Sequence, residues 1–148
     1  MSGKRKEITR RIRAKLKSAR VARLGTVDAK LRPHIVPVCF AYDGKVFYTA
    51  IDQKPKRVPP ERLVRLQNIL AVPQVALLID QYNEDWGQLW YILIRGKAKL
   101  LPMHGFKERG WALRELRAKY PQYTTRMLPD SAPIIRIVPG RATFWGRV

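Results

Sequence analysis

The sequence predicts a mainly β domain of the α+β class. We expect about seven antiparallel strands in a small closed or nearly closed barrel, with short helices across its openings. The length of 148 residues suits a single domain. Seven short apolar segments are separated by turn residues, which is typical of antiparallel sheets. Two or three other segments show the spacing of apolar side chains that indicates a helix.

The N-terminal segment predicts a basic amphipathic helix over residues 1–18, ahead of a barrel domain over residues 19–148. Ile8, Ile12 and Leu16 recur every fourth residue and form a narrow apolar stripe. Residues 1–24 hold ten basic residues and one acid, about half of the formal net charge of +19. This pattern favours a helix that docks through its stripe and leaves a solvated basic face. The alternative is an arm that binds nucleic acid, which is less favoured because no known nucleic-acid-binding motif accompanies it.

The strands are punctuated by turn residues. Asp43-Gly44 is typical of a two-residue hairpin turn. Pro37 predicts an edge strand or a bulge, because proline has no N–H to donate, and Gly96 predicts a bulge in a long strand. The predicted strands are Val21–Val27, His34–Tyr42, Lys45–Ile51, Val75–Asp80, Trp86–Leu101, Ile134–Val138 and Ala142–Val148.

Two further helices are predicted between the strands. One begins near Pro60, where Leu63, Leu66 and Leu70 have helical spacing, and the other spans roughly Gly105–Tyr120.

Composition limits the classes of protein that fit. The longest apolar run, around Val75–Ile79, is much shorter than a membrane-spanning helix, and residues 1–24 do not resemble a secretory signal. Cys39 is the single cysteine, so no intrachain disulfide forms, and we expect a small buried hydrophobe in a cytoplasmic protein. His34, His104 and Cys39 lie in unrelated segments and do not predict a metal site.

The segment after the third strand carries an unusual concentration of positive charge. Lys54, Lys56 and Arg57 flank Pro55, close to the start of the helix at Pro60. A constrained basic turn beside a helix N-terminus predicts a phosphate site, because N–H groups and the helix dipole add to the side-chain charge. A solvated basic turn is an equally good interpretation of the spacing alone.

Four segments follow one another along the chain: DGKVFYTAIDQKPKR, LVRLQNILAVPQVALLID, LIRGKAKLL and FWGRV. Their order and spacing resemble the pyridoxamine-phosphate-oxidase-like, flavin-binding split-barrel superfamily, and especially its small enzymes that use the 5-deazaflavin coenzyme. The resemblance covers residues from about 19 to 148. It implies a homodimeric split barrel with the cofactor in a groove between subunits. The implied cofactor is the 8-hydroxy-5-deazaflavin coenzyme F-420, with flavin mononucleotide (FMN) as the alternative.

The resemblance also implies residue roles. One strand would run along the coenzyme ring and meet its polar edge with backbone groups: His34, Ile35, Val36, Pro37 and Val38. Tyr48 and Thr49 would touch the phosphate–ribityl chain, and Lys54, Lys56 and Arg57 would bind the phosphate. Four further residues would reach the cofactor, often from the partner subunit: Gln88, Trp90, Trp145 and Arg147. For the two tryptophans a place in the barrel core is the alternative, and for Arg147 a frayed tail.

The resemblance implies an oxidoreductase that transfers a hydride between its coenzyme and a small organic substrate, with no other catalytic pair required. His34 and Tyr48 are candidate proton donors, although a purely structural role suits His34 better. Val38 stands where pyridoxamine phosphate oxidases proper have a basic residue, and the chain stops at Val148 before their substrate-binding segment. We therefore do not expect pyridoxamine oxidation. The alternative functions are a cofactor-, haem- or tetrapyrrole-binding protein without turnover, and a nucleic-acid binder.

Overall fold

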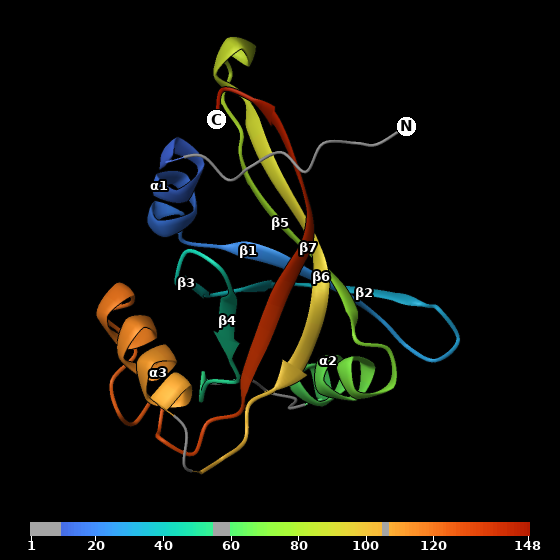
Figure 1. Ribbon diagram of the computed structural model, residues 1–148, viewed down its shortest axis with the longest axis vertical. Coiled ribbons are helices and arrows are strands. Elements are labelled where there is room, and N and C mark those ends of the chain that lie inside the picture. The colour runs from blue at the N-terminus through green and yellow to red at the C-terminus, as the bar shows by residue number, and fades with distance from the viewer. Residues whose placement is uncertain (1–9, 55–59, 105–106) are drawn as a thin grey trace.

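The computed structural model describes residues 10–54, 60–104 and 107–148, with only the backbone of residues 60–63. Seven antiparallel strands form one curled sheet in the order β2-β1-β5-β6-β7-β4-β3 (Figure 1). The strands are β1 Ala22–Val27, β2 Pro33–Val38, β3 Ala41–Tyr42, β4 Phe47–Ala50, β5 Gln74–Gln81, β6 Trp90–Leu100 and β7 Ile134–Gly146. The helices are α1 Arg10–Ser18, α2 Pro60–Ala71 and α3 Lys107–Lys119, with a short 3-10 helix, η1, at Trp86–Gln88. The predicted mainly β barrel class is confirmed, in the form of a curled half-barrel.

The two edge strands of the sheet, β2 and β3, are neighbours in the chain, so the prediction of one strand over His34–Tyr42 is wrong. The chain turns at Cys39-Phe40, between β2 and β3. There the backbone groups of Phe40 hydrogen-bond to side chains at the end of α3 and just after it, and not to another strand. The Tyr120 hydroxyl accepts a hydrogen bond from the Phe40 backbone N–H at 3.0 Å, and Lys119 Nζ donates to the Phe40 carbonyl at 3.0 Å. Pro37 lies on an edge strand, as its missing N–H predicts.

The long strands also differ from the prediction. Residues predicted as two last strands form the single strand β7, which pairs with β6 from Trp90 to Leu100. The irregularity predicted at Gly96 is confirmed: the register shifts between Arg95 and Gly96, and a Cβ at Gly96 would collide with the Val138 carbonyl. Residues 86–88 are helical rather than extended, because the Asp85 side chain accepts from the Gly87 N–H at 3.0 Å and caps η1.

In the view of Figure 1, α1 and α3 lie to the left of the long strands and α2 lies to the right. The buried apolar residues form two clusters. From α1, Ile12 and Leu16 are buried in the barrel interior, as their spacing predicts, whereas Ile8 lies outside the described residues. Among the described side chains of α2, Ile69 is buried and Leu66 packs partly buried against the core, as predicted for Leu66, whereas Leu70 is exposed, contrary to the prediction. The side chain of Leu63 lies outside the described part of the structure. A second apolar cluster lies under α3 and includes Leu113, Leu116 and Tyr48.

Candidate functional site

A pocket of about 380 Å³ lies beside edge strand β2 and brings together residues that were predicted from distant parts of the sequence. It is lined by Val21, Val36, Pro37, Val38, Cys39, Lys54 and Arg65. The strand predicted to follow the coenzyme ring thus meets one of the cations predicted to bind the phosphate. We call this hollow the ring pocket.

One wall of the ring pocket suits a flat heteroaromatic ring. Val21, Val36 and Val38 present apolar surface. Because β2 is the last strand on its side of the sheet, backbone N–H and C=O groups on its outer side have no neighbouring strand. Such groups can hydrogen-bond the polar edge of a ring that lies against the strand.

Lys54 is held in the ring pocket by a buried acid. Its Nζ lies 2.6 Å from Asp52 Oδ2, which also accepts a hydrogen bond from the Tyr123 hydroxyl at 2.6 Å. Burial acts to raise the pKa of Asp52, but hydrogen bonds from Lys54 and Tyr123 outweigh it and hold that pKa below its usual value. Asp52 is therefore an anion that fixes the position of the cation.

Three lining residues, Val21, Cys39 and Arg65, were not predicted to bind the cofactor. Arg65 comes from α2, is buried, and brings a second cation to the ring pocket. The sequence gives no signal that singles out Arg65, because its burial appears only in the structure. Cys39 packs against the second apolar cluster but is half-buried rather than fully buried, and its Sγ lies 3.9 Å from Lys54 Nζ.

A second hollow of about 240 Å³ gathers Gln88, Trp90 and Arg147 with residues of α1. We call it the helix pocket. These three residues were predicted to act together, and the structure brings them together. Trp90 is largely buried, and its Nε1 donates to Gln81 Oε1 at 3.0 Å. Trp145 does not line the helix pocket; it is 52% exposed and stacks on Tyr91 with ring centroids 5.8 Å apart.

The family follows from a sequence comparison. The profile of pyridoxamine 5'-phosphate oxidase matches residues 8–146, which is nearly the whole chain. The chain belongs to the pyridoxamine 5'-phosphate oxidase family. The resemblance inferred from the sequence is thus confirmed. In a separate comparison, no curated protein shows a significant match to this chain.

Solved structures with the same fold carry several kinds of cofactor. HutZ, a haem storage protein from Vibrio cholerae, matches with a TM-score of 0.70 at 12% identity, over 95% of this chain and 94% of that one. A FAD-binding protein from Mesorhizobium loti matches with a TM-score of 0.67 at 20% identity, over 89% of each chain. An F420 reductase matches with a TM-score of 0.61 at 22% identity, over 88% of this chain and 94% of that one. At these identities the likeness establishes the fold alone.

In this member of the family, Tyr48 and Thr49 do not line the ring pocket. Tyr48 is buried under α3, where its hydroxyl donates to Glu108 Oε1 at 2.7 Å and its ring lies beside Trp111. Burial and that hydrogen bond raise the pKa of Tyr48 well above its usual value, so it retains its proton. Thr49 is buried beside it. The roles predicted for both residues remain predictions.

His34 and Ile35 lie on opposite faces of β2. His34 is half-buried, and its Nδ1 is buried without a hydrogen-bond partner among the described residues. Ile35 points outward and is 69% exposed. Lys56 and Arg57 lie outside the described residues, so their predicted phosphate contacts remain predictions.

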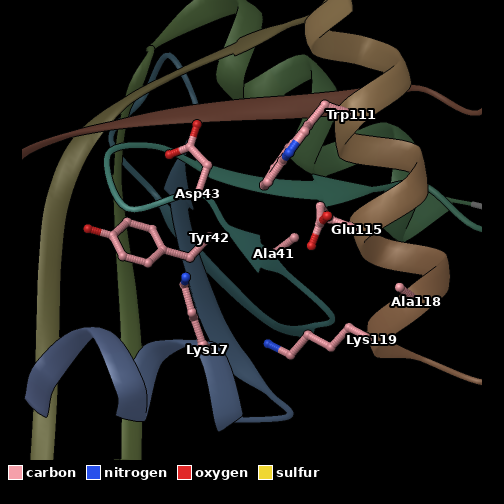
Figure 2. A pocket seen from close by; sticks show the side chains of 8 residues that line it. All are labelled: Lys17, Ala41, Tyr42, Asp43, Trp111, Glu115, Ala118 and Lys119. Atoms are coloured by element: carbon pink, nitrogen blue, oxygen red, sulfur yellow. The ribbon is translucent and has the colours of Figure 1, made fainter. Parts of the chain in front are cut away.

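A third hollow, of about 460 Å³, lies between α1, β3 and α3 (Figure 2). Its lining mixes two acids, Asp43 and Glu115, with Lys17 and Lys119, and includes none of the predicted site residues. Burial, and then the charge of Arg20, lower the pKa of Lys119 to about 8. Its ammonium group donates to the Phe40 carbonyl and lies 3.8 Å from the centre of the Phe40 ring, so Lys119 has a structural role at the turn between β2 and β3.

The described residues contain no group of three or more His, Cys, Asp or Glu side chains placed to hold a metal ion. None of the helices in this part of the chain combines the length and apolar character needed to cross a bilayer.

Proposed function

We propose that this protein is an oxidoreductase that binds the deazaflavin coenzyme F-420 in the ring pocket, with FMN as the close variant. It would transfer a hydride between the coenzyme and a small organic substrate. The observation that carries the proposal is the arrangement of the ring pocket, in which an apolar wall and an open strand edge lie next to two cations, Lys54 and Arg65.

The residues present fit a flavin-type coenzyme. The volume of about 380 Å³ is within the range of roughly 300–1,000 Å³ that is typical of small-molecule sites. Lys54 and Arg65 supply the positive charge that a phosphate group requires, and contacts of this kind are worth about 1.5–3 kcal/mol each where water is excluded. The Asp52 carboxylate lies 2.6 Å from Lys54 Nζ and fixes the position of the ammonium group in the ring pocket.

The bound coenzyme would supply the hydride chemistry, and the chain would position it. Val36 and Val38 would exclude water from one face of the ring. Backbone groups of β2 would orient its polar edge, and Lys54 would fix the opposite end through the phosphate. His34 lies on the same face of β2 as Val36. Of the two predicted proton donors, His34 and Tyr48, it is the nearer in sequence to this wall.

A homodimer in the cytoplasm belongs to the same proposal. Ile35, together with Pro33, Val75 and Ala76, lines an apolar hollow of about 420 Å³ on the outer face of the sheet. Trp86 and Trp145 are also exposed, at 73% and 52%. Exposed large apolar side chains of this kind favour burial against a partner. Of the four residues predicted to reach the cofactor, often from the partner subunit, Trp145 is exposed, whereas Gln88, Trp90 and Arg147 line the helix pocket.

The test is an absorbance and fluorescence titration of the purified protein with F-420, with FMN and with riboflavin. We expect saturable binding of F-420 or FMN, and weaker binding of riboflavin, which has no phosphate. Lys54→Met should weaken binding of the phosphorylated coenzymes at least tenfold. Lys45→Met, which removes an exposed cation on the β3–β4 hairpin, is the matched control and should not. If neither F-420 nor FMN binds, the proposal is wrong.

Haem binding without turnover is the second candidate. The observation that favours it is the buried Nδ1 of His34, which has no partner among the described residues and could present a nitrogen ligand to iron. A titration with haemin separates the two functions. A sharp Soret band that is lost in His34→Ala, with no binding of either coenzyme, would support haem binding instead.

A further inference from the structure

We propose that the helix pocket, between α1 and the end of the barrel, is a second binding site that takes a compact oxyanion, a phosphate or carboxylate group. This gives the basic face of α1 a function that the ring pocket does not use. The proposal does not depend on which coenzyme the ring pocket takes.

Three cations line the helix pocket. Arg11 and Lys15 lie one turn apart on α1, and Arg147 follows β7. Among the described residues, no acid lines the pocket and no carboxylate lies within ion-pair distance of these three side chains. Three converging positive charges without a counterion in this part of the chain favour an anionic ligand.

Lys15 is held in place without being neutralised. Its Nζ lies 4.7 Å from the centre of the Trp90 ring, which is within the range of a cation–π contact. An aromatic face fixes the direction of the side chain but, unlike a carboxylate, carries no net charge. The ammonium group therefore keeps its full charge and its N–H donors for a ligand.

Amide side chains add hydrogen-bond donors to the pocket. Gln81 Oε1 accepts a hydrogen bond from Trp90 Nε1 at 3.0 Å, and Asn83 Oδ1 accepts from the Asp85 backbone N–H at 2.8 Å. These contacts engage both carbonyl oxygens with protein donors, and the NH₂ group of each amide is a hydrogen-bond donor. Together with the three cations, these donors favour an acceptor-rich anion.

The acids of the neighbouring hairpin are committed elsewhere. Asp80 pairs with Arg23 at 2.7 Å, Glu84 accepts from the Tyr82 hydroxyl at 3.3 Å, and Asp85 caps η1. These contacts keep the carboxylates that are nearest in sequence engaged away from the cations of the pocket.

Arg147 is positioned by the backbone. Gly146 has φ +81°, a conformation that favours glycine, and a Cβ there would collide with the Leu89 carbonyl. This turn brings the Arg147 N–H within 3.0 Å of the Leu89 oxygen. The last turn of the chain is therefore fastened to the segment that carries Trp90, and Arg147 is not a loose tail.

The size of the pocket limits the ligand. Its volume of about 240 Å³ is below the roughly 300 Å³ at which small-molecule sites begin. The helix pocket therefore has room for one anionic group and not for a flavin ring. Phosphate and carboxylate share the required chemistry, and they can be told apart by the probe.

The test is a titration of the full-length protein with inorganic phosphate and, separately, with γ-glutamylglutamate at constant ionic strength. Binding is followed by the indole N–H signal of Trp90 in ¹H–¹⁵N spectra, assigned with Trp90→Phe. We expect saturable shifts with at least one probe, and the probe that binds identifies the anion. The double variant Arg11→Gln/Lys15→Gln should weaken that binding at least tenfold, since two charge-assisted contacts are lost.

The matched control is Arg10→Gln/Arg13→Gln, which removes the same charge from the same helix at exposed positions outside the pocket. It should change the affinity by less than about twofold at physiological salt, where charges beyond about 8 Å are screened. Equal losses in both double variants would mean general attraction to a basic protein and would overturn the proposal. So would shifts that do not saturate with either probe. If Lys54→Met loses coenzyme binding but still binds phosphate, the result would support an anion site in the helix pocket that is separate from the ring pocket.

Discussion

Replacing Lys54 by methionine should weaken coenzyme binding and destabilise the protein for separable reasons. Asp52 is 7% exposed and accepts hydrogen bonds from Lys54 Nζ at 2.6 Å, from the Lys54 backbone N–H at 3.1 Å and from Tyr123 at 2.6 Å. Lys54→Met removes the first and leaves a buried carboxylate without its cation. A charge-assisted hydrogen bond contributes about 1.5–3 kcal/mol. Because half of the Lys54 side chain is exposed, screening reduces the expected loss to about 1–2 kcal/mol.

A second substitution, at Asp52, separates the loss of coenzyme binding from the loss of stability. Asp52→Asn in the Lys54→Met background removes the uncompensated charge, and the amide oxygen can still accept from Tyr123. We expect the double variant to regain stability to within about 0.5 kcal/mol of wild type, measured by urea unfolding, while coenzyme affinity stays at least tenfold reduced. If affinity returns together with stability, the loss in Lys54→Met came from the damaged fold, and the assignment of Lys54 to the phosphate is refuted.

The pH dependence of unfolding gives an independent check of the same contact. The folded-state pKa of Asp52 is lowered, so its contribution to stability is present above the unfolded value of about 3.9 and is lost as pH falls below it. In Lys54→Met the effect of burial remains and the main opposing contact is gone, so the pKa of Asp52 should rise. The stability deficit of that variant should therefore be largest near neutral pH and should shrink below about pH 4. An unchanged deficit across this range would contradict the ion-pair explanation.

Three further predictions follow from particular contacts. Glu108→Gln should destabilise the protein by about 1–2 kcal/mol in urea unfolding, because Glu108 Oε1 accepts from Tyr48 at 2.7 Å and from Arg136 Nε at 2.5 Å at a partly exposed site. Gly96→Ala should cost about 1–3 kcal/mol in thermal unfolding, since the added Cβ meets the Val138 carbonyl; an unchanged Tm would contradict this. Ile35→Lys should shift light scattering from dimer to monomer at micromolar concentration, and a wild-type monomer with coenzyme bound would contradict the proposed dimer.

The strands of the barrel were largely predictable because they depend on local patterns. Apolar segments between turn residues located each part of the sheet, and Gly96 located its irregularity. The errors lie where distant contacts decide. The corner at Phe40 exists because Tyr120 and Lys119, about eighty residues later, take its backbone groups. No signal within His34–Tyr42 shows those partners.

The candidate site was predictable in part for the same reason. Lys54 stood out as one of three cations on a constrained turn, and resemblance to the family linked it to the Val36–Val38 strand. Arg65 and Asp52 did not stand out, because an arginine on a helix and an aspartate after a strand are common in any sequence. Their importance arises from burial: Asp52 needs a cation because it is out of water, and Arg65 brings its charge to the same hollow.

The acids Asp52, Glu108 and Asp130 pair with basic or hydroxyl groups that hold the fold together, and the cations of the helix pocket are supported by uncharged groups instead. The Asp52 carboxylate orients Lys54 from behind, Glu108 ties β4 and β7 to α3, and Asp130 pairs with Arg117 near the end of that helix. Each acid is therefore used to fix an element of the fold. At the helix pocket the supports are neutral, a tryptophan ring under Lys15 and a backbone turn before Arg147. Fastening cations with uncharged groups preserves their attraction for anions, and this is the physical reason to look for a ligand between α1 and the barrel.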